Sequence, residues 1–388
     1  MTDSKITSTE AIFLVVTIFV AHTLSSLPQN LINNTKSSTI INLIYIGIIV
    51  TLISYLIYRL LKNFGSQDII DISEYLGGKI FKNIIGCIFI IYLVISSSSL
   101  LKDFCEGLHI AFFPMTNVSY IIISFVIVLF ITNSLSFGSN IKAISIVFPI
   151  VLTSIVFLFI GNISHFSYEN FFPILGKGFV NTFITGIGNI GALGGIFLLY
   201  FLPPYLKKPE KMKKICILSV IIGSIYLILC LATIVLMFSL FVGTGKVLPL
   251  YSAARYIEFG TFFQRLESLF MVIWILEICC YLVIINRFSI SILQKLTNIE
   301  DQKSLAFIYP LLILGVSLLS KNYATIRYFE SKIYFYLVYF IVLGLGIGIL
   351  ILANLKKRKI KNIERKDSET LEWKKLSKYY VLLLYLYC

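Results

Sequence analysis

The chain alternates between long apolar stretches and short polar segments. Most of the apolar stretches approach the length of about 20 residues that a helix needs to cross a bilayer, and they exceed the usual length of a strand. The pattern predicts ten membrane-spanning helices, at residues 9–31, 39–61, 84–102, 118–135, 143–161, 182–202, 215–242, 266–285, 305–319 and 333–352. The expected fold class is therefore an all-α polytopic membrane protein.

Two of these predicted spans are interrupted by residues that break helices. The first contains the polar run 22–26, His-Thr-Leu-Ser-Ser, followed by Pro28. The sixth carries five glycines between residues 186 and 195. Because lipid offers no hydrogen-bond partner, an unwound segment is tolerated only beside protein or a water-filled cavity. The alternative for the glycines is that they only let neighbouring helices pack closely.

The two breaks lie five spans apart, which is the spacing expected of a five-plus-five inverted repeat. In such folds the binding site lies near the midplane, between the two repeats, where unwound backbone offers donors and acceptors. No residue-level repeat between the halves is visible, so the symmetry is inferred from hydropathy and breaks. The predicted ligand-binding residues at the breaks are His22, Thr23, Ser25, Ser26, Gly186, Gly188, Asn189 and Gly191.

Glu277 is a further predicted ligand-binding residue, because it falls near the middle of the eighth span. A charge at that depth costs roughly 2.5–3.5 kcal/mol on insertion scales. The carboxylate could bind a cation, a proton or a ligand amine; alternatively, it is a neutral glutamate bonded to a neighbouring helix. Asp103 and Glu106 follow the start of the third span by about one span's length and are expected at the outer interface, near Lys102; the alternative is a role in a vestibule.

Composition supports the membrane assignment and charge sets its orientation. Hydrophobic residues make up 58% of the chain and charged residues 13%, which excludes an ordinary soluble domain. With the N-terminus inside, the predicted cytoplasmic segments hold 24 of the 33 Lys and Arg residues, so both termini are expected in the cytoplasm. The predicted domains are a transmembrane unit, 1–355, and a basic cytoplasmic tail, 356–388, whose apolar end 379–388 is too short to cross.

Enzyme chemistry finds no support in the sequence. The three histidines are scattered, the seven cysteines form no CxxC pair, and no nucleophile–base pair can be assembled. The run Gly186-Ile-Gly-Asn-Ile-Gly matches a dinucleotide-binding pattern but follows no soluble strand. We therefore expect no enzymatic activity, no cofactor, no metal and no nucleic-acid partner.

Residues 249–274 carry a more specific signature. The segment reads PLYSAARYIEFGTFFQRLESLFMVIW and contains the run Arg255-x-Ile257-x-x-Gly260-x-Phe262-x-Gln264-Arg265-Leu266-Glu267-Ser268-Leu269. This run resembles the hallmark of the spore germination permeases, the GerAB-type B subunits of nutrient germinant receptors in endospore-forming bacteria. Residues 74–79 and 170–178 also resemble that family, and the resemblance extends to about residue 355.

The resemblance implies a fold of the amino acid–polyamine–organocation superfamily, LeuT-like, with broken first and sixth helices. It implies a receptor in the spore inner membrane with an A subunit and a lipoprotein C subunit, binding a small germinant, often an amino acid, and triggering ion release. Arg255, Arg265 and Glu267 would belong to an outer gate or a partner contact; from the residues alone, Arg265 is a plain interfacial anchor. The alternatives are a secondary amino-acid transporter and a structural scaffold.

Two departures from the family pattern bear on the ligand. The first break, His-Thr-Leu-Ser-Ser, is not glycine-rich, and Ile141-Lys142 stands where relatives often carry an arginine. Both leave the identity of the germinant open.

Overall fold

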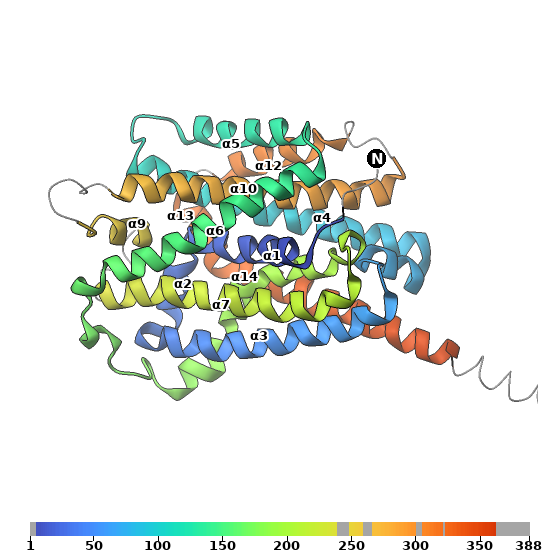
Figure 1. Cartoon of the computed structure of the whole chain (residues 1–388), viewed down its shortest axis with the longest axis horizontal. Coiled ribbons are helices and arrows are strands. Elements are labelled where there is room, and N and C mark those ends of the chain that lie inside the picture. Colours follow the sequence, from blue (N-terminus) through green and yellow to red (C-terminus); the bar gives the residue numbers. More distant parts are fainter. Residues whose placement is uncertain (1–4, 239–247, 259–265, 300–304, 321–322, 362–388) are drawn as a thin grey trace, which may run out of the picture.

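The computed structural model describes residues 5–238, 248–258, 266–299, 305–320 and 323–361. Arg265 and the chain beyond residue 361, with the apolar end 379–388, lie outside these residues. The described chain is almost entirely helical, and its helices run along the long axis of one bundle (Figure 1).

Within the described ranges the chain passes along the bundle ten times, as the apolar pattern predicts. The first five passes are α1 (Ser8–Thr23) with α2 (Leu27–Thr35), α3 (Thr39–Leu61), α4 (Ile69–Ala111), α5 (Val118–Asn133) and α6 (Phe137–Gly161). The sixth to ninth are η5 (Val180–Ile184) with η6 (Thr185–Tyr200), α7 (Met212–Met237), α10 (Leu266–Thr297) and α12 (Ile308–Leu319). The tenth comprises α13 (Tyr323–Tyr328), η9 (Phe329–Ile333), α14 (Tyr334–Leu337) and η10 (Val338–Gly346) and continues to Lys361.

Both ends of the described chain lie at the same end of the bundle. Ile6 forms a bridge with Leu206, and Lys356 donates to the carbonyl oxygen of Tyr75 at 2.8 Å. This end is termed the terminal end, and the opposite end, where α9 (Pro249–Ala254) lies, is termed the far end (Figure 1).

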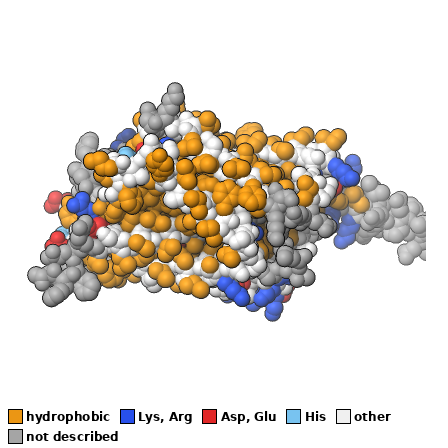
Figure 2. Space-filling view, turned by 90° about the horizontal axis from the view of Figure 1, so that it is seen from above, with side chains coloured by type: hydrophobic (Ala, Val, Ile, Leu, Met, Phe, Trp, Pro, Cys, Tyr) orange, Lys and Arg blue, Asp and Glu red, His pale blue; other side chains and the backbone are white. Residues whose placement is uncertain are grey.

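The flank of the bundle is apolar. Seven helices of the described chain are long and apolar enough to cross a membrane, and three shorter apolar helices accompany them. Ile48, Leu52, Ile146 and Phe340 are among the large apolar side chains that face outward. Figure 2 shows apolar side chains spread over the flank and charged ones gathered toward the two ends. The chain is a multi-pass membrane protein.

Passes from the first half pack against their counterparts in the second half. The first pass contacts the sixth (α1 and η6), and the second contacts the seventh (α3 and α7). The third contacts the eighth (α4 and α10), and the fourth contacts the ninth (α5 and α12). A spacing of five passes in each pair is the arrangement expected of two five-helix repeats that face one another across a common axis.

Three passes are longer than the apolar pattern predicts. The eighth is expected at 266–285, but α10 continues to Thr297. The third span was expected at 84–102, but α4 reaches Ala111, after a break at Gly77 and Gly78 where Gly78 has φ +74°. The tenth was expected at 333–352, but helix begins at Tyr323 and runs to Lys361. In each case the apolar run ends at charged residues that lie inside the bundle, such as Asp103, Arg287 and Glu330.

Candidate functional site

The first pass is interrupted, as predicted from its polar run. α1 ends at Thr23, residues 24–26 form a turn, and α2 starts at Leu27 with a proline in its first turn. The hydroxyl of Ser25 donates to the carbonyl oxygen of His22 at 2.9 Å. All four predicted ligand-binding residues of this segment are buried (His22, Thr23, Ser25 and Ser26). The protein therefore holds a short non-helical backbone segment in its interior.

A carboxylate from the third pass holds this break. The backbone N–H of Ser26 donates to Oδ2 of Asp103 at 2.7 Å. Asp103 and Glu106 are expected at the outer interface near Lys102. The contact with Lys102 is confirmed, because Glu106 pairs with it at 3.1 Å, but both carboxylates are buried. The expected position was wrong because the first N–H groups of a helix need acceptors, and α4 supplies one to α2 from inside the bundle.

His22 lies among aromatic side chains. Its ring stacks on Tyr334 with centroids 5.0 Å apart and meets Tyr281 edge-on at 5.5 Å. Its Nε2 lies 3.1 Å from the Tyr334 hydroxyl, within hydrogen-bond distance. In this conformation His22 links the break to the tenth and eighth passes. Its role in ligand binding stays a prediction.

Glu277 is fully buried in α10, with 0% of its surface exposed. Neither of its carboxylate oxygens has a hydrogen-bond partner within the described part of the chain. Tyr226 of α7 lies within electrostatic range of Glu277, and its hydroxyl lies beside the side chains of Thr23 and Cys230. Since buried polar atoms are usually satisfied, the unpartnered carboxylate favours the binding interpretation of Glu277 over the structural one.

The sixth pass departs from α-helical geometry throughout. A π turn, η5, leads into the 3-10 helix η6, and Leu193 has non-helical angles (φ −102°, ψ 27°). Runs of 3-10 helix longer than about four residues are uncommon and often mark hinges or strained sequence. The sixth pass is thus irregular rather than opened into a gap.

The polar groups at the start of η6 are bonded to other passes. Nδ2 of Asn189 donates to Oδ1 of Asn42 at 2.8 Å, and Oδ1 of Asn189 accepts from Asn34 at 2.9 Å. The carbonyl oxygen of Gly186 accepts from Asn42, and that of Gly188 accepts from Tyr339. A ligand reaching these atoms would have to displace side chains that already occupy them.

Several glycines of this pass serve close packing. A Cβ at Gly191 would lie 2.0 Å from Cδ1 of Phe335, and one at Gly195 would lie 2.8 Å from Cδ1 of Phe19. At these two positions the glycines allow neighbouring helices to pack closely, as the alternative interpretation predicts. The predicted residues thus form two separate groups. His22, Thr23, Ser25 and Ser26 lie at the break of the first pass, whereas the predicted residues of the sixth pass contact α2 through Asn34. Ligand binding by Gly186, Gly188, Asn189 and Gly191 stays a prediction.

The predicted gate or partner residues lie apart from the break. Arg255 is exposed and follows α9 at the far end, whereas Glu267 is buried in the first turn of α10. Arg265 lies outside the described residues. Their assignment to a gate or a partner contact stays a prediction.

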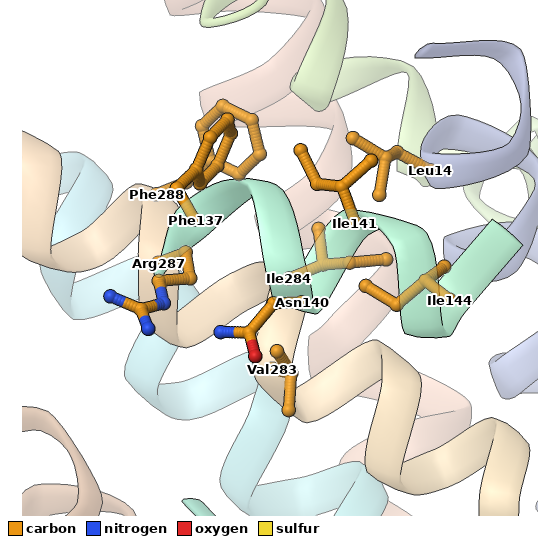
Figure 3. A pocket seen from close by; sticks show the side chains of 9 residues that line it. All are labelled: Leu14, Phe137, Asn140, Ile141, Ile144, Val283, Ile284, Arg287 and Phe288. Atoms are coloured by element: carbon orange, nitrogen blue, oxygen red, sulfur yellow. The ribbon is translucent and has the colours of Figure 1, made fainter. Parts of the chain in front are cut away.

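Two cavities accompany these elements. One, of about 440 Å³, is lined by Asn30, Asn33, Asn34, Arg327, Tyr328, Ser331 and Lys332, from α2 and the tenth pass. The other, of about 10 Å³, lies between α1, α6 and α10 (Figure 3). Beside it, Arg287 donates to the carbonyl oxygens of Thr132 and Leu135. The first is large enough for a small molecule, and the second holds at most about one water.

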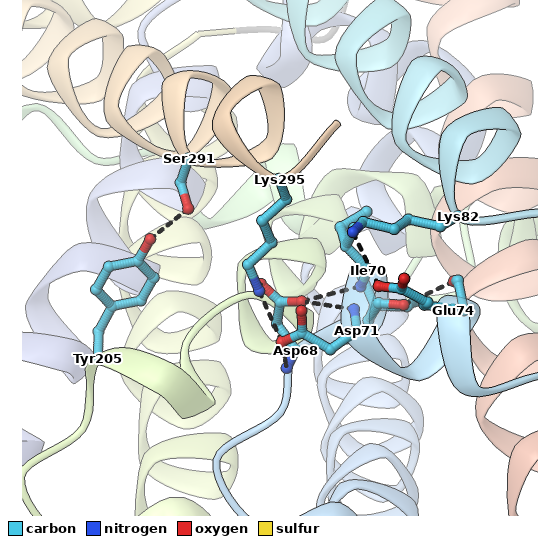
Figure 4. Close-up of polar contacts among 10 residues, drawn as sticks. Asp68, Ile70, Asp71, Glu74, Lys82, Tyr205, Ser291 and Lys295 are labelled. Atoms are coloured by element: carbon cyan, nitrogen blue, oxygen red, sulfur yellow. Dashed lines mark hydrogen bonds and ion pairs between the residues drawn. The ribbon is translucent and has the colours of Figure 1, made fainter. Parts of the chain in front are cut away.

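A charged cluster joins α4 to α10 at the terminal end. Nζ of Lys295 lies 2.6 Å from Oδ2 of Asp68 and 2.7 Å from Oδ2 of Asp71 (Figure 4). Oδ1 of Asp68 also accepts from the N–H groups of Ile70 and Asp71, which caps the helix. Burial raises the pKa of Asp68 from 3.8 to about 6, and the Lys295 ammonium offsets only part of this effect.

The raised pKa predicts the sign of a pH effect. The protonated form of Asp68 stabilises the fold; this contribution is complete below pH 3.8 and is lost as the pH rises to about 6. Its size is at most about 3 kcal/mol. Asp68→Asn keeps the cap but cannot ionise. Thermal unfolding of both purified proteins between pH 4 and 7 should show wild type losing stability relative to the variant up to pH 6; parallel profiles would contradict this.

Sequence reasoning missed Asp103 and Glu330 as interior residues, and it missed Arg327 as a cavity-lining residue. Glu330 is buried on η9. One sequence signal was available for Asp103. Proline often follows the end of a helix, and the first proline after the third span is Pro114, so the helix could continue past residue 103. For Arg327 and Glu330 no sequence signal separated buried or cavity-lining charges from membrane-edge charges.

Comparisons with known proteins agree with this architecture. The family model described as "Spore germination protein" matches residues 5–325. Among curated proteins, spore germination protein GerQB of Bacillus cereus is 25% identical over 240 residues, 60% of this chain and 64% of that protein, a little under two thirds of its length. Spore germination protein YndE of Bacillus subtilis (strain 168) is 22% identical over 72% of this chain and 78% of its own.

A third curated relative and one solved structure are also similar to this chain. Spore germination protein A2 of Bacillus subtilis (strain 168) is 26% identical over 79% of this chain and 85% of that protein. The fold is similar to that of a Na⁺-coupled sialic acid symporter in its substrate-bound outward-open state, with TM-score 0.59 and 13% identity, over 88% of this chain and 78% of the symporter. The fold is thus the LeuT-like transporter fold, and the chain belongs to the spore germination protein family.

Proposed function

We propose that this chain is the integral membrane B subunit of a spore nutrient germinant receptor. It binds a small germinant, expected to be an amino acid, in the transporter-like interior and thereby triggers germination and ion release. It acts with an A subunit and a lipoprotein C subunit in the spore inner membrane, with both termini in the cytoplasm. The observation that carries this proposal is the buried break at residues 24–26, in a chain of the spore germination protein family.

A physical route from binding to signalling follows from the contacts around the break. Asp103 ties it to the third pass, and the rings of Tyr334 and Tyr281 tie it to the tenth and eighth. A ligand that bonds the freed backbone at residues 24–26 competes with or extends these contacts. The two repeats can adopt two arrangements relative to one another, and the ligand favours the arrangement that it binds more tightly.

The test is a germination assay with spores that carry this chain as their B subunit, measured as the fall in optical density and the release of ions on addition of single amino acids. A response to at least one amino acid, changed in ligand preference by Ser25→Ala or Ser26→Ala, supports the receptor. No response to any of the twenty contradicts an amino-acid receptor. Accumulation of labelled amino acid by proteoliposomes containing the chain alone identifies the transporter alternative.

Glu277→Gln is expected to raise the amino-acid concentration for half-maximal response by roughly 10- to 100-fold. The reason is that a hydrogen bond to a charged group is worth about 1.5–3 kcal/mol, and glutamine keeps the shape of the side chain without its charge. Glu74→Gln is the matched control: Glu74, whose side chain is 36% exposed, pairs with Lys82 at 2.8 Å, and ion pairs near the surface contribute little. An unchanged dose response in Glu277→Gln spores would assign Glu277 a structural role.

A further inference from the structure

The cavity of about 440 Å³ lies between α2 and the start of the tenth pass, on the stretch of α2 that leads from the break to the far end. Three asparagines of α2 line one side, and four residues of the tenth pass supply the rest: Arg327, Tyr328, Ser331 and Lys332. Ligand pockets typically measure about 300–1,000 Å³. The cavity therefore has the volume of a site for a small molecule.

The described lining of this cavity is positive. Arg327 and Lys332 provide two cations, and none of its seven lining residues is acidic. The asparagine amides and the hydroxyls of Tyr328 and Ser331 are neutral hydrogen-bonding groups. Arginine presents a planar fork of donors that matches a carboxylate, and lysine adds a compact positive charge. The lining thus has the chemistry of a carboxylate site.

Buried carboxylates lie next to this positive lining. Glu330 belongs to the same stretch as Arg327 and Lys332, and Asp103 lies within electrostatic range of both Glu330 and Arg327. Within the described chain, Oδ1 of Asp103 and Oε1 of Glu330 are buried without a hydrogen-bond partner. Acceptors for a positively charged group are therefore available between the cavity and the break.

We propose that this cavity is a capture site for a small zwitterion, which rests on the amino-acid receptor proposed above. Arg327 and Lys332 bind the carboxylate of the ligand, and Asp103 and Glu330 attract its ammonium group toward the break. Ligands that carry only one of the two charges satisfy only one half of this arrangement. The site thus selects free amino acids over simple organic acids and simple amines.

The experiment measures charge selectivity with reagents that do not depend on knowing the germinant. Ser331→Cys places a thiol on the cavity lining, and its labelling rate is measured with anionic methanethiosulfonate ethylsulfonate and with cationic methanethiosulfonate ethyltrimethylammonium. Met115→Cys is the matched control, because Met115 is 98% exposed at the far end and is not a lining residue. Labelling of the unsubstituted protein, which retains its own cysteines, is subtracted.

The ratio of anionic to cationic labelling rates is expected to be roughly tenfold higher at Ser331→Cys than at Met115→Cys, because a charged cleft concentrates counter-ions. Adding Arg327→Gln and Lys332→Gln should bring the ratio within about twofold of the control. Equal ratios at the two positions, or a ratio unaffected by removing the two cations, overturn the proposal.

A protection assay then separates a zwitterion from a simple anion. Each of the twenty amino acids, acetate and ethylammonium is added before labelling of Ser331→Cys. At least one amino acid should slow labelling more than acetate does, and ethylammonium should not slow it. If acetate protects as well as every amino acid, the zwitterion site is rejected. A germination response without charge selectivity removes only the capture site, whereas selectivity without any response removes the receptor proposal.

Discussion

Asp103→Leu is expected to reduce the germination response by at least about tenfold and to lower the thermal stability of the purified protein. Leucine has the same branched skeleton as aspartate but is larger and has no acceptor, so the N–H of Ser26 loses the partner that it reaches at 2.7 Å. A buried donor left unsatisfied costs about 1–3 kcal/mol. A negative group near the first turn of α2 also interacts favourably with the helix dipole, and leucine removes this interaction as well.

Asp103→Asn is the matched control for this prediction. Asparagine keeps an oxygen that can accept from Ser26 but carries no charge. It should retain the stability that the hydrogen bond provides and lose the contribution of the charge. If Asp103→Leu has wild-type thermal stability and a wild-type germination response, Asp103 does not hold the break.

Gly223→Ala is the second large effect, on folding rather than on signalling. Gly223 of α7 faces the ring of Phe19 on α1, and a Cβ there would lie 2.3 Å from Cδ2 of Phe19. The ring has little room to move, because Gly195 of η6 approaches its other edge. Overpacking of a filled core costs about 1–3 kcal/mol, so the unfolding temperature and the yield of folded protein should fall.

Gly315→Ala provides the control of opposite sign. Gly315 lies in α12, and a Cβ there meets nothing within 4 Å among the described residues. Alanine is favoured over glycine in helices by about 1 kcal/mol, so this variant should be as stable as wild type or more so. In the double variant Phe19→Leu with Gly223→Ala, the smaller side chain should recover part of the loss. An unchanged unfolding temperature in Gly223→Ala would show that the ring of Phe19 is not held tightly between Gly223 and Gly195.

The breaks illustrate how far local sequence could be interpreted. The polar run at residues 22–26 with Pro28 predicted the interruption of the first pass, and the structure has its turn at 24–26. The glycines of residues 186–195 predicted irregular backbone in the sixth pass, and η5 and η6 are irregular. Backbone geometry responds to local residue type, which is why both positions were predictable. What faces each break depends on other passes.

The interior charges show the opposite case. Asp103 and Glu330 stand near the ends of apolar runs, where charged residues usually meet water or headgroups, yet both are buried. Their true position follows from helices that continue past them, α4 to Ala111 and the tenth pass from Tyr323. Hydropathy averages over all faces of a helix, so it cannot separate a charge facing the bundle from one at the membrane edge.

The sequence by itself determined that this protein spans a membrane and how its helices are arranged. Ten long apolar segments require a bilayer, and two interruptions five segments apart indicate the repeat. Only the tertiary structure decided which groups meet: Asp103 with Ser26, His22 with Tyr334, and the cations of the tenth pass with the asparagines of α2. The physical reason is the distance along the chain over which each interaction acts. Hydrophobic length and backbone preference act within one segment, whereas hydrogen bonds and charge pairs form between residues that only folding brings together.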